Sequence, residues 1–277
     1  MADFVSTRRV GEATVAAISD GVGPWAPQLS APEAEWRREV PEANAAGEFP
    51  LEWSVGFASV GGKNVVVDLG FDDPGPASRW MPPRFERSPG VEAGLASLGV
   101  QPEQVDYVLI THHHGDHVAG ALTRRDGRAV LRYPNARHLI NRLDWEEAAR
   151  QGQRGPGSPL ATLKEQGRLD VVEGDREVLP GVALLHAPGE SPGHSAIRVS
   201  SGGQTAYFFG DLFHHPCEVA HPSWVSPGRD QPVVLASRQR LLAAAADEGA
   251  ACTFSHARLP AWGRILRAGA GYRWEWL

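Results

Sequence analysis

The sequence predicts an α/β sandwich built as one domain with a peripheral N-terminal arm, and three observations predict it. An alternating segment, 54–60, turns at 61–64 and returns as an apolar run ending near Asp68, which indicates a hairpin leading into a buried strand. Residues 105–111 form a second short β-branched run, and helical periodicity precedes it at 91–99. The chain of 277 residues is long for one domain, yet a two-layered sandwich can contain it.

The other elements follow in chain order. The arm, residues 1–50, contains a strand at 12–21 and a short helix after Pro32. Prolines and glycines across 73–90 predict an irregular flap over a pocket. Downstream we expect a strand at 136–142, a helix at 144–151, strands near 169–172, 182–186, 196–200 and 205–209, and a helix at 233–249.

Composition excludes several functional classes. Hydrophobic residues make up 42% and charged residues 22%, which is ordinary globular usage. The net charge is −6 and the lysines are only Lys63 and Lys164, so we expect no nucleic-acid partner. Cys217 and Cys252 are too few for a disulfide framework, and we expect both to be buried. No apolar run approaches the roughly 18 residues of a membrane span, and no signal peptide is apparent; we expect a cytoplasmic protein with no membrane partner.

The segment "ITHHHGDHVAG", residues 110–120, carries the strongest chemical signal. Alternate side chains of an extended segment face the same way, so His112 and His114 converge while His113 faces away and packs. Gly115 permits a tight turn, after which Asp116 and His117 approach the same space from another direction. This geometry suits two metal ions. Imidazole and carboxylate ligands together suit zinc, although iron, manganese or cobalt can use the same ligands.

Three later segments each place a metal-binding type of side chain where a strand ends or a sheet edge opens. These are His194 in "APGESPGHS", Asp211 in "YFFGDLF" and His256 in "CTFSH". With them, the chain over roughly residues 12–266 resembles the metallo-β-lactamase superfamily, whose signature HxHxDH is met by His112, His114, Asp116 and His117.

The resemblance implies an αββα sandwich and a ligand set for two metals. It implies that the first metal is bound by His112, His114 and His194. It implies that the second is bound by Asp116, His117 and His256, and that Asp211 bridges the two.

Several neighbouring residues admit a second interpretation. His186 ends a strand and is an alternative to His194 as ligand, although the family's glycine loop favours His194. Relatives often carry a histidine where this chain has Glu190, a departure that leaves its contacts open without removing a ligand. Asp68 is expected to anchor the ligand loops, because metal-binding histidines usually donate their other N–H to a carboxylate or carbonyl. His138 is expected to be an ordinary strand residue.

The resemblance further implies hydrolysis through a metal-bridging hydroxide, since divalent zinc lowers the pKa of bound water toward about 7. Asp116 or His214 could protonate the leaving group. His214 stands three residues after Asp211, where lactonase-like relatives place a tyrosine that touches substrate, and a structural imidazole is the equal alternative. Glutamate replaces the second signature histidine in diiron relatives and true β-lactamases lack the bridging aspartate, so His114 and Asp211 favour the lactonase, esterase and triesterase branch.

We therefore expect a hydrolase with two zinc ions that cleaves a lactone or carboxylic ester. An organophosphate triesterase is one alternative, and a biosynthetic acyl-thioesterase-like or non-catalytic ligand-binding member is another. The expected substrate is small and uncharged, because the segments around the ligands contain almost no basic residues except Arg258 and Arg264. The aromatic arm is apolar surface of the kind that marks interaction sites, which leaves a homodimer open.

Overall fold

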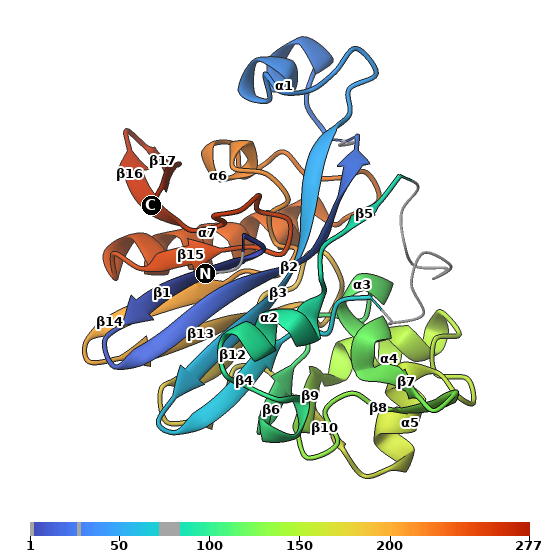
Figure 1. Cartoon of the computed structure of the whole chain (residues 1–277). Helices are drawn as coiled ribbons and strands as arrows, with labels where there is room; N and C mark the ends of the chain where they lie inside the picture. The colour runs from blue at the N-terminus through green and yellow to red at the C-terminus, as the bar shows by residue number, and fades with distance from the viewer. Residues whose placement is uncertain (1–2, 27–28, 72–83) are drawn as a thin grey trace.

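The computed structural model describes residues 3–26, 29–71 and 84–277. Within these ranges two mixed β-sheets lie face to face, with helices on their outer sides (Figure 1). This is the predicted αββα arrangement. Residues 73–83 of the predicted flap lie outside the described residues.

The larger sheet has eight described strands in the order β1-β2-β3-β4-β6-β9-β10, with β5 paired to β2. Parallel pairing joins β4, β6, β9 and β10, so their carboxyl ends share one edge. The strands are β1 (Val5–Val10), β2 (Ala13–Trp25), β3 (Phe49–Val60), β4 (Lys63–Val67), β5 (Glu86–Arg87), β6 (Tyr107–Leu109), β9 (Arg137–Asn141) and β10 (Leu169–Val172).

The second sheet follows chain order, β11 to β17. Its β14 and β15 are parallel, and β13 is antiparallel to β14, so the start of β13 lies beside the ends of β14 and β15. The strands are β11 (Arg176–Leu179), β12 (Val182–His186), β13 (Ser195–Ser201), β14 (Gln204–Phe208), β15 (Ala251–Thr253), β16 (Gly263–Ala268) and β17 (Gly271–Trp276); a separate hairpin pairs β7 (Leu122–Arg125) with β8 (Arg128–Leu131).

Helices begin where side chains satisfy their first backbone N–H groups. Asn141 caps α4, Ser158 caps α5 and Asp230 caps α7, which also has Pro232 in its first turn. The helices are α1 (Glu33–Glu39), α2 (Val91–Ser97), α3 (Gly115–Val118), α4 (Arg142–Arg150), α5 (Pro159–Glu165), α6 (Cys217–Ala220) and α7 (Gln231–Asp247), with short 3-10 turns η2 (Pro102–Gln104) and η3 (Ala119–Ala121).

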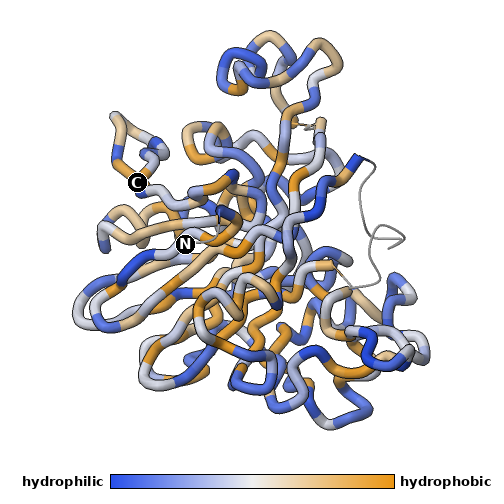
Figure 2. The backbone as a smooth tube through the Cα atoms, viewed as in Figure 1, coloured by the Kyte–Doolittle hydropathy of each residue, from blue (hydrophilic) through white to orange (hydrophobic). Residues whose placement is uncertain are grey.

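Strand alternation divides the core into two apolar layers. Val65 and Val67 of β4 face the second sheet, whereas Val66 between them faces the layer shared with α2, α4 and α5. Leu241 and Leu242 of α7 join the layer of the second sheet. Figure 2 shows the hydrophobic segments concentrated along the strands and the polar segments in the peripheral loops. No helix in the described part of the chain is long and apolar enough to cross a membrane.

The expected arm divides into two parts. Strands β1 and β2 belong to the larger sheet, where β2 pairs with β3 along most of its length. The segment around α1 stands apart from the sandwich (Figure 1) and packs through Trp36 and Val40 against Cys217 and Trp224. The sequence did not reveal β1, because its residues "VSTRRV" lack strict alternation.

Candidate metal centre

The seven candidate ligands come from loops and from the short helix α3 at one edge of the sandwich. His112 and His114 follow β6, and Asp116 and His117 lie on α3. His194 precedes β13, Asp211 follows β14 and His256 follows β15. The prediction that strands end just before His112, Asp211 and His256 is confirmed, because β6, β14 and β15 end at Leu109, Phe208 and Thr253. Parallel pairing places the ends of β14 and β15 side by side, and β6 of the facing sheet ends at the same edge of the sandwich.

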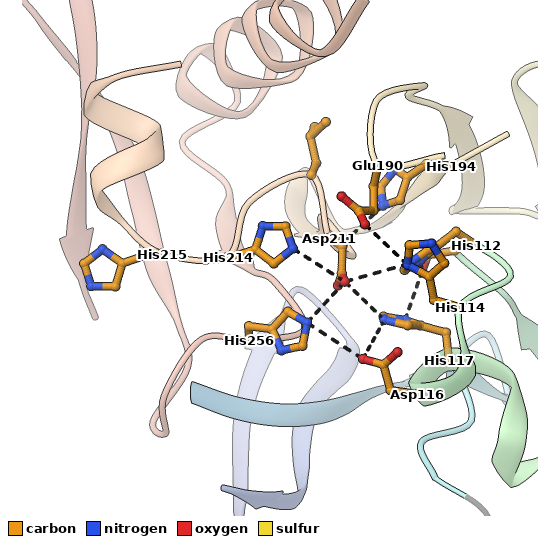
Figure 3. A network of polar contacts seen from close by, with 12 residues as sticks. His112, His114, Asp116, His117, Glu190, His194, Asp211, His214, His215 and His256 are labelled. Atoms are coloured by element: carbon orange, nitrogen blue, oxygen red, sulfur yellow. Dashed lines mark hydrogen bonds and ion pairs between the residues drawn. The ribbon is translucent and has the colours of Figure 1, made fainter. Parts of the chain in front are cut away.

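The Asp211 carboxylate is the centre of the cluster (Figure 3). Its Oδ2 lies 3.1 Å from Nε2 of His256, 3.4 Å from Nε2 of His117 and 3.8 Å from Nε2 of His112. One oxygen therefore faces ring nitrogens from both halves of the HxHxDH segment. This position fits a carboxylate shared between two cations.

One group of ligand atoms belongs to Asp116, His117, Asp211 and His256, all within 4.8 Å of one another. Nε2 of His117 lies 3.3 Å from Oδ2 of Asp116, and that same nitrogen is buried without a hydrogen-bond partner. A buried imidazole nitrogen left unpaired beside two carboxylates is costly unless a cation joins them. The residues therefore fit a divalent metal at this position.

A second group consists of His112, His114 and Glu190, whose ligand atoms also lie within 4.8 Å of one another. Nε2 of His112 and Nδ1 of His114 are 3.0 Å apart. Among the described residues, His194 is not in this group: its Nε2 accepts a hydrogen bond from the Asp211 amide at 3.1 Å. The structure thus brings His194 to the edge of the centre and places the Glu190 carboxylate within the group.

In three of the candidate ligand histidines, Nδ1, the ring nitrogen on the other side from Nε2, contacts an oxygen atom of the protein. Nδ1 of His117 contacts the Asp68 carboxylate at 2.8 Å, Nδ1 of His194 the Ala187 carbonyl at 3.0 Å, and Nδ1 of His256 the Glu52 carbonyl at 2.8 Å. Donation from Nδ1 leaves a lone pair on Nε2. This is the tautomer that a metal-binding histidine needs, with an outer oxygen that fixes the ring.

The electrostatics of the cluster separate neutral from charged imidazoles. Burial lowers the pKa of His112 well below its usual value and lowers the pKa of His194 to about 3. Burial also opposes the charge on His117, but the Asp211, Asp116 and Asp68 carboxylates outweigh it and raise its pKa well above the usual range. The same negative field that favours a proton on His117 favours a metal cation there.

Asp68 anchors the ligand loop as predicted. Besides His117, its carboxylate accepts hydrogen bonds from the Thr111 amide at 2.7 Å and the Thr111 hydroxyl at 2.9 Å. Its backbone has φ of 65°, a left-handed conformation that aspartate and asparagine tolerate better than most residues. The backbone turn after β4 therefore directs this carboxylate beneath the histidines.

His113 is buried and belongs to none of the described metal groups, which fits the packed role that the sequence predicts, and its ring stacks on that of His114 with the centroids 5.0 Å apart. Its amide donates to the Asp144 carboxylate at 2.9 Å. His186 and His138 also lie outside the described metal groups: Nε2 of His186 contacts the Pro192 carbonyl at 3.0 Å, and His138 is a buried residue of β9. Both cysteines are free and buried, as expected.

His214 stacks between Trp25 and His256, with ring centroids 5.3 and 5.4 Å away. Its Nε2 lies 3.8 Å from Oδ2 of Asp211, and its amide donates to Glu218. Burial by itself lowers the pKa of His214, but the Glu218, Asp211 and Glu190 carboxylates raise it to about 9. The ring is both structurally packed and adjacent to the reactive centre, so both interpretations of the sequence retain support.

Sequence reasoning missed an arginine at the site. Arg229 forms a two-point ion pair with Glu190, with Nε 3.0 Å from Oε2, and lines a cavity of about 290 Å³ with Trp25 and His214. It lies 18 residues after Asp211 in a loop without a metal-ligand motif. The unusual glutamate in "PGESPGH" was the available signal, because a buried carboxylate requires a partner.

The metallo-beta-lactamase superfamily model matches residues 54–256, which include all seven candidate ligands. The chain belongs to this superfamily. An N-acyl homoserine lactonase of Bacillus sp. is 31% identical over 107 residues, covering 39% of this chain and 38% of that protein. A probable metallo-hydrolase of Mycobacterium tuberculosis is 26% identical over 171 residues, covering 54% of this chain and 53% of that protein. These matches span about half or less of the curated relatives' lengths.

Solved structures agree over nearly the whole chain. Hydrolase AbOPH of the beta lactamase superfamily has a TM-score of 0.81 at 20% identity, covering 100% of this chain and 98% of that one. AidC, a dizinc quorum-quenching lactonase in complex with a product, has a TM-score of 0.78 at 20% identity, covering 100% and 99%. At this identity the likeness establishes the αββα fold that the sequence predicts.

Proposed function

We propose that the protein is a dinuclear zinc hydrolase that cleaves a lactone or carboxylic ester. The observation that carries the proposal is the position of Asp211, whose Oδ2 faces His112 on one side and His117 and His256 on the other. A single carboxylate oxygen shared by two ligand groups suits a pair of divalent cations.

In this proposal the first metal is held by His112, His114 and His194, the second by Asp116, His117 and His256, with Asp211 shared. A bound metal pair supplies a water of lowered pKa and polarises the oxygen atom that gains charge. Zinc is proposed because it accepts both imidazole nitrogen and carboxylate oxygen.

The chain's own groups then bind and orient the substrate. Trp25 offers an apolar wall beside His214 in the cavity, which suits an acyl chain or alkyl group. His214 Nε2 lies on the Asp211 side of its ring and can donate a proton to a departing oxygen. Asp116, one-fifth exposed, is the other candidate for that role.

An uncharged substrate is favoured by the charges around the cavity. Arg229 reaches the cavity, but its positive charge is paired with Glu190. Because Glu190 already pairs with this guanidinium, the ion pair does not favour an anionic substrate such as nucleic acid over a neutral one. Lactones are proposed ahead of phosphotriesters because the Bacillus relatives are N-acyl homoserine lactonases.

A hydrolysis panel tests the proposal. Purified protein, loaded with zinc, is offered an N-acyl homoserine lactone, a p-nitrophenyl ester, an aryl phosphotriester and a β-lactam. We expect two metal equivalents per chain and the highest kcat/KM with the lactone or carboxylic ester. A preference for the phosphotriester would establish the triesterase alternative. Bound metal without turnover of any substrate would favour a non-catalytic or acyl-thioesterase-like member, and full activity after chelation would reject the metal mechanism.

A further inference from the structure

Glu190 brings a carboxylate into the group formed by His112 and His114. Its Oε1 lies 3.3 Å from Nδ1 of His114, the nitrogen that itself lies 3.0 Å from Nε2 of His112. Figure 3 shows the carboxylate directed at the two rings from the loop between β12 and β13.

We propose that Glu190 is a direct ligand of the first metal, together with His112 and His114. This inference rests on the proposed dinuclear function and names a ligand that the superfamily signature does not include. It makes the first site a set of two imidazoles and a carboxylate. His194, which the proposed function also assigns to this metal, is then a further donor.

The burial of Glu190 supports the proposal. The residue is 8% exposed, and its ligand atoms lie within 4.8 Å of those of His112, which is 0% exposed. Taking a carboxylate out of water is costly. Arg229 compensates part of that cost from one side, whereas the neutral imidazoles of His112 and His114, which present lone pairs, compensate none of it. A cation between the two nitrogens and the carboxylate oxygen satisfies all three groups.

Arg229 holds the carboxylate in the required direction. Its guanidinium binds both Glu190 oxygens from the cavity side, which leaves Oε1 also facing His114. Two parallel contacts of this kind fix the plane of the carboxylate. The loop itself is held by Asp144, which accepts hydrogen bonds from Ser191 and Gly193 at 2.8 and 2.7 Å.

The position of His194 leaves room for a further ligand beside it at the first metal. Its Nε2 already accepts the Asp211 amide, and its Nδ1 contacts the Ala187 carbonyl, so both ring nitrogens have protein partners. Glu190 reaches the His112 and His114 nitrogens more directly. Because a carboxylate is a harder ligand than imidazole, Glu190 should shift the first site from zinc toward manganese or iron(II) relative to an all-histidine site.

The experiment measures metal binding rather than turnover. Metal-free wild-type protein, Glu190→Gln and Glu190→His are titrated separately with zinc and manganese, with bound metal counted by mass spectrometry and the cobalt(II) form examined by absorption. We expect Glu190→Gln to lower the affinity for one of the two metal ions by at least about 10-fold. Changes to the residues around a metal commonly have an effect of this size. We expect Glu190→His to raise the ratio of zinc to manganese affinity and to change the cobalt(II) spectrum.

Two controls separate a ligand from a structural ion pair. Arg229→Met removes the partner and keeps the carboxylate, so first-site affinity should fall far less than in Glu190→Gln. Ser191→Ala perturbs the same loop and should leave the cobalt(II) spectrum unchanged. Equal losses in Glu190→Gln and Arg229→Met would overturn the proposal, as would unchanged binding in Glu190→Gln. If Glu190→Gln does not fold, an unchanged metal preference and spectrum in Glu190→His would overturn it. Two bound metals without hydrolysis would instead count against the proposed function alone.

Discussion

The Asp144 carboxylate accepts a hydrogen bond from the Gly193 amide at 2.7 Å and thereby connects α4 to the loop that carries Glu190 and His194. The same carboxylate accepts from the His113 amide at 2.9 Å, within the HxHxDH segment. Asp144 is fully buried, so these contacts hold two ligand loops in one fixed relation. A Cβ on Gly193 would approach the Asp144 nitrogen to 2.4 Å, so the loop packs here without room for a side chain.

Asp144→Asn should destabilise the protein and loosen metal binding. Asparagine retains the shape but replaces an accepting oxygen by an NH₂ group, which leaves at least one buried N–H or O–H donor unpaired. Such a loss costs about 1–3 kcal/mol. Urea unfolding measures the change, and Ser191→Ala, which removes one contact of Asp144, should cost less. Equal stability of Asp144→Asn and the wild type would show that the carboxylate is not needed as an acceptor.

Asp68→Asn should lower metal affinity more than it lowers stability. Asparagine tolerates the left-handed backbone at this position. It cannot supply the carboxylate charge that His117 contacts at 2.8 Å. Loss of such an outer partner typically weakens metal binding about 10–100-fold. Competition with a coloured chelator measures the affinity; retention equal to the wild type would argue that Asp68 holds only the backbone of the loop.

Removing single ligands should separate the two metals. Asp211→Ala deletes the shared oxygen and should reduce the number of metal ions bound per chain. The second metal should be lost most, while the apolar layers keep the fold intact. His112→Ala and His194→Ala should abolish most turnover with every ester, since the nitrogen of a ligand cannot be replaced by a methyl group. Metal analysis and circular dichroism are compared for the three variants. Two full equivalents in Asp211→Ala would contradict its position as the shared carboxylate.

Much of this architecture is encoded locally. The strand of residues 182–186 and the helix α7 could be predicted because a short apolar run between proline-glycine pairs and a capped alanine-rich run are local signals. The HxHxDH spacing likewise places its ligands on a turn after a strand. The resemblance supplied the later ligands, since no periodicity reveals that residues 211 and 256 meet.

The remainder depends on tertiary contacts. The ion pair of Glu190 and Arg229 joins residues 39 positions apart, and nothing in either local sequence requires it. Strand β1 is determined by its pairing with β2 rather than by its own composition. Short turns such as α6 form where Glu218 meets His214 and Arg238, contacts that only the folded chain creates.

His214→Phe should slow hydrolysis unequally among substrates. Phenylalanine can retain the stacking on Trp25 and His256 but has no proton to donate. General acid assistance is typically worth about 100- to 10,000-fold and matters most for basic leaving groups. Rates for esters with phenol and alkyl alcohol leaving groups, compared as a series, measure the effect. An equal loss across the series would remove the acid role from His214 and leave the metal site unaffected.

His138 should make stability depend on pH below neutrality. Burial in β9 lowers its pKa from 6.5 to about 4, although the Arg168 and Ala136 carbonyls partly oppose this. Between about pH 6.5 and 4 the unfolded chain therefore binds a proton that the folded chain does not. The contribution of His138 to the free energy of unfolding is therefore fully present above pH 6.5. It falls by about 3 kcal/mol in total as the pH drops toward 4.

The variant His138→Leu isolates that contribution. Leucine keeps the site apolar between Val108 and Leu169, its neighbours in register, and cannot titrate. Unfolding by urea at pH 7 and pH 4.5 gives a stability difference for each protein. The loss between the two pH values should be smaller in His138→Leu, because ligand histidines titrate equally in both proteins and cancel in the comparison. Identical losses would mean that His138 is protonated alike in the folded and unfolded chains, and that its burial does not exclude the charge.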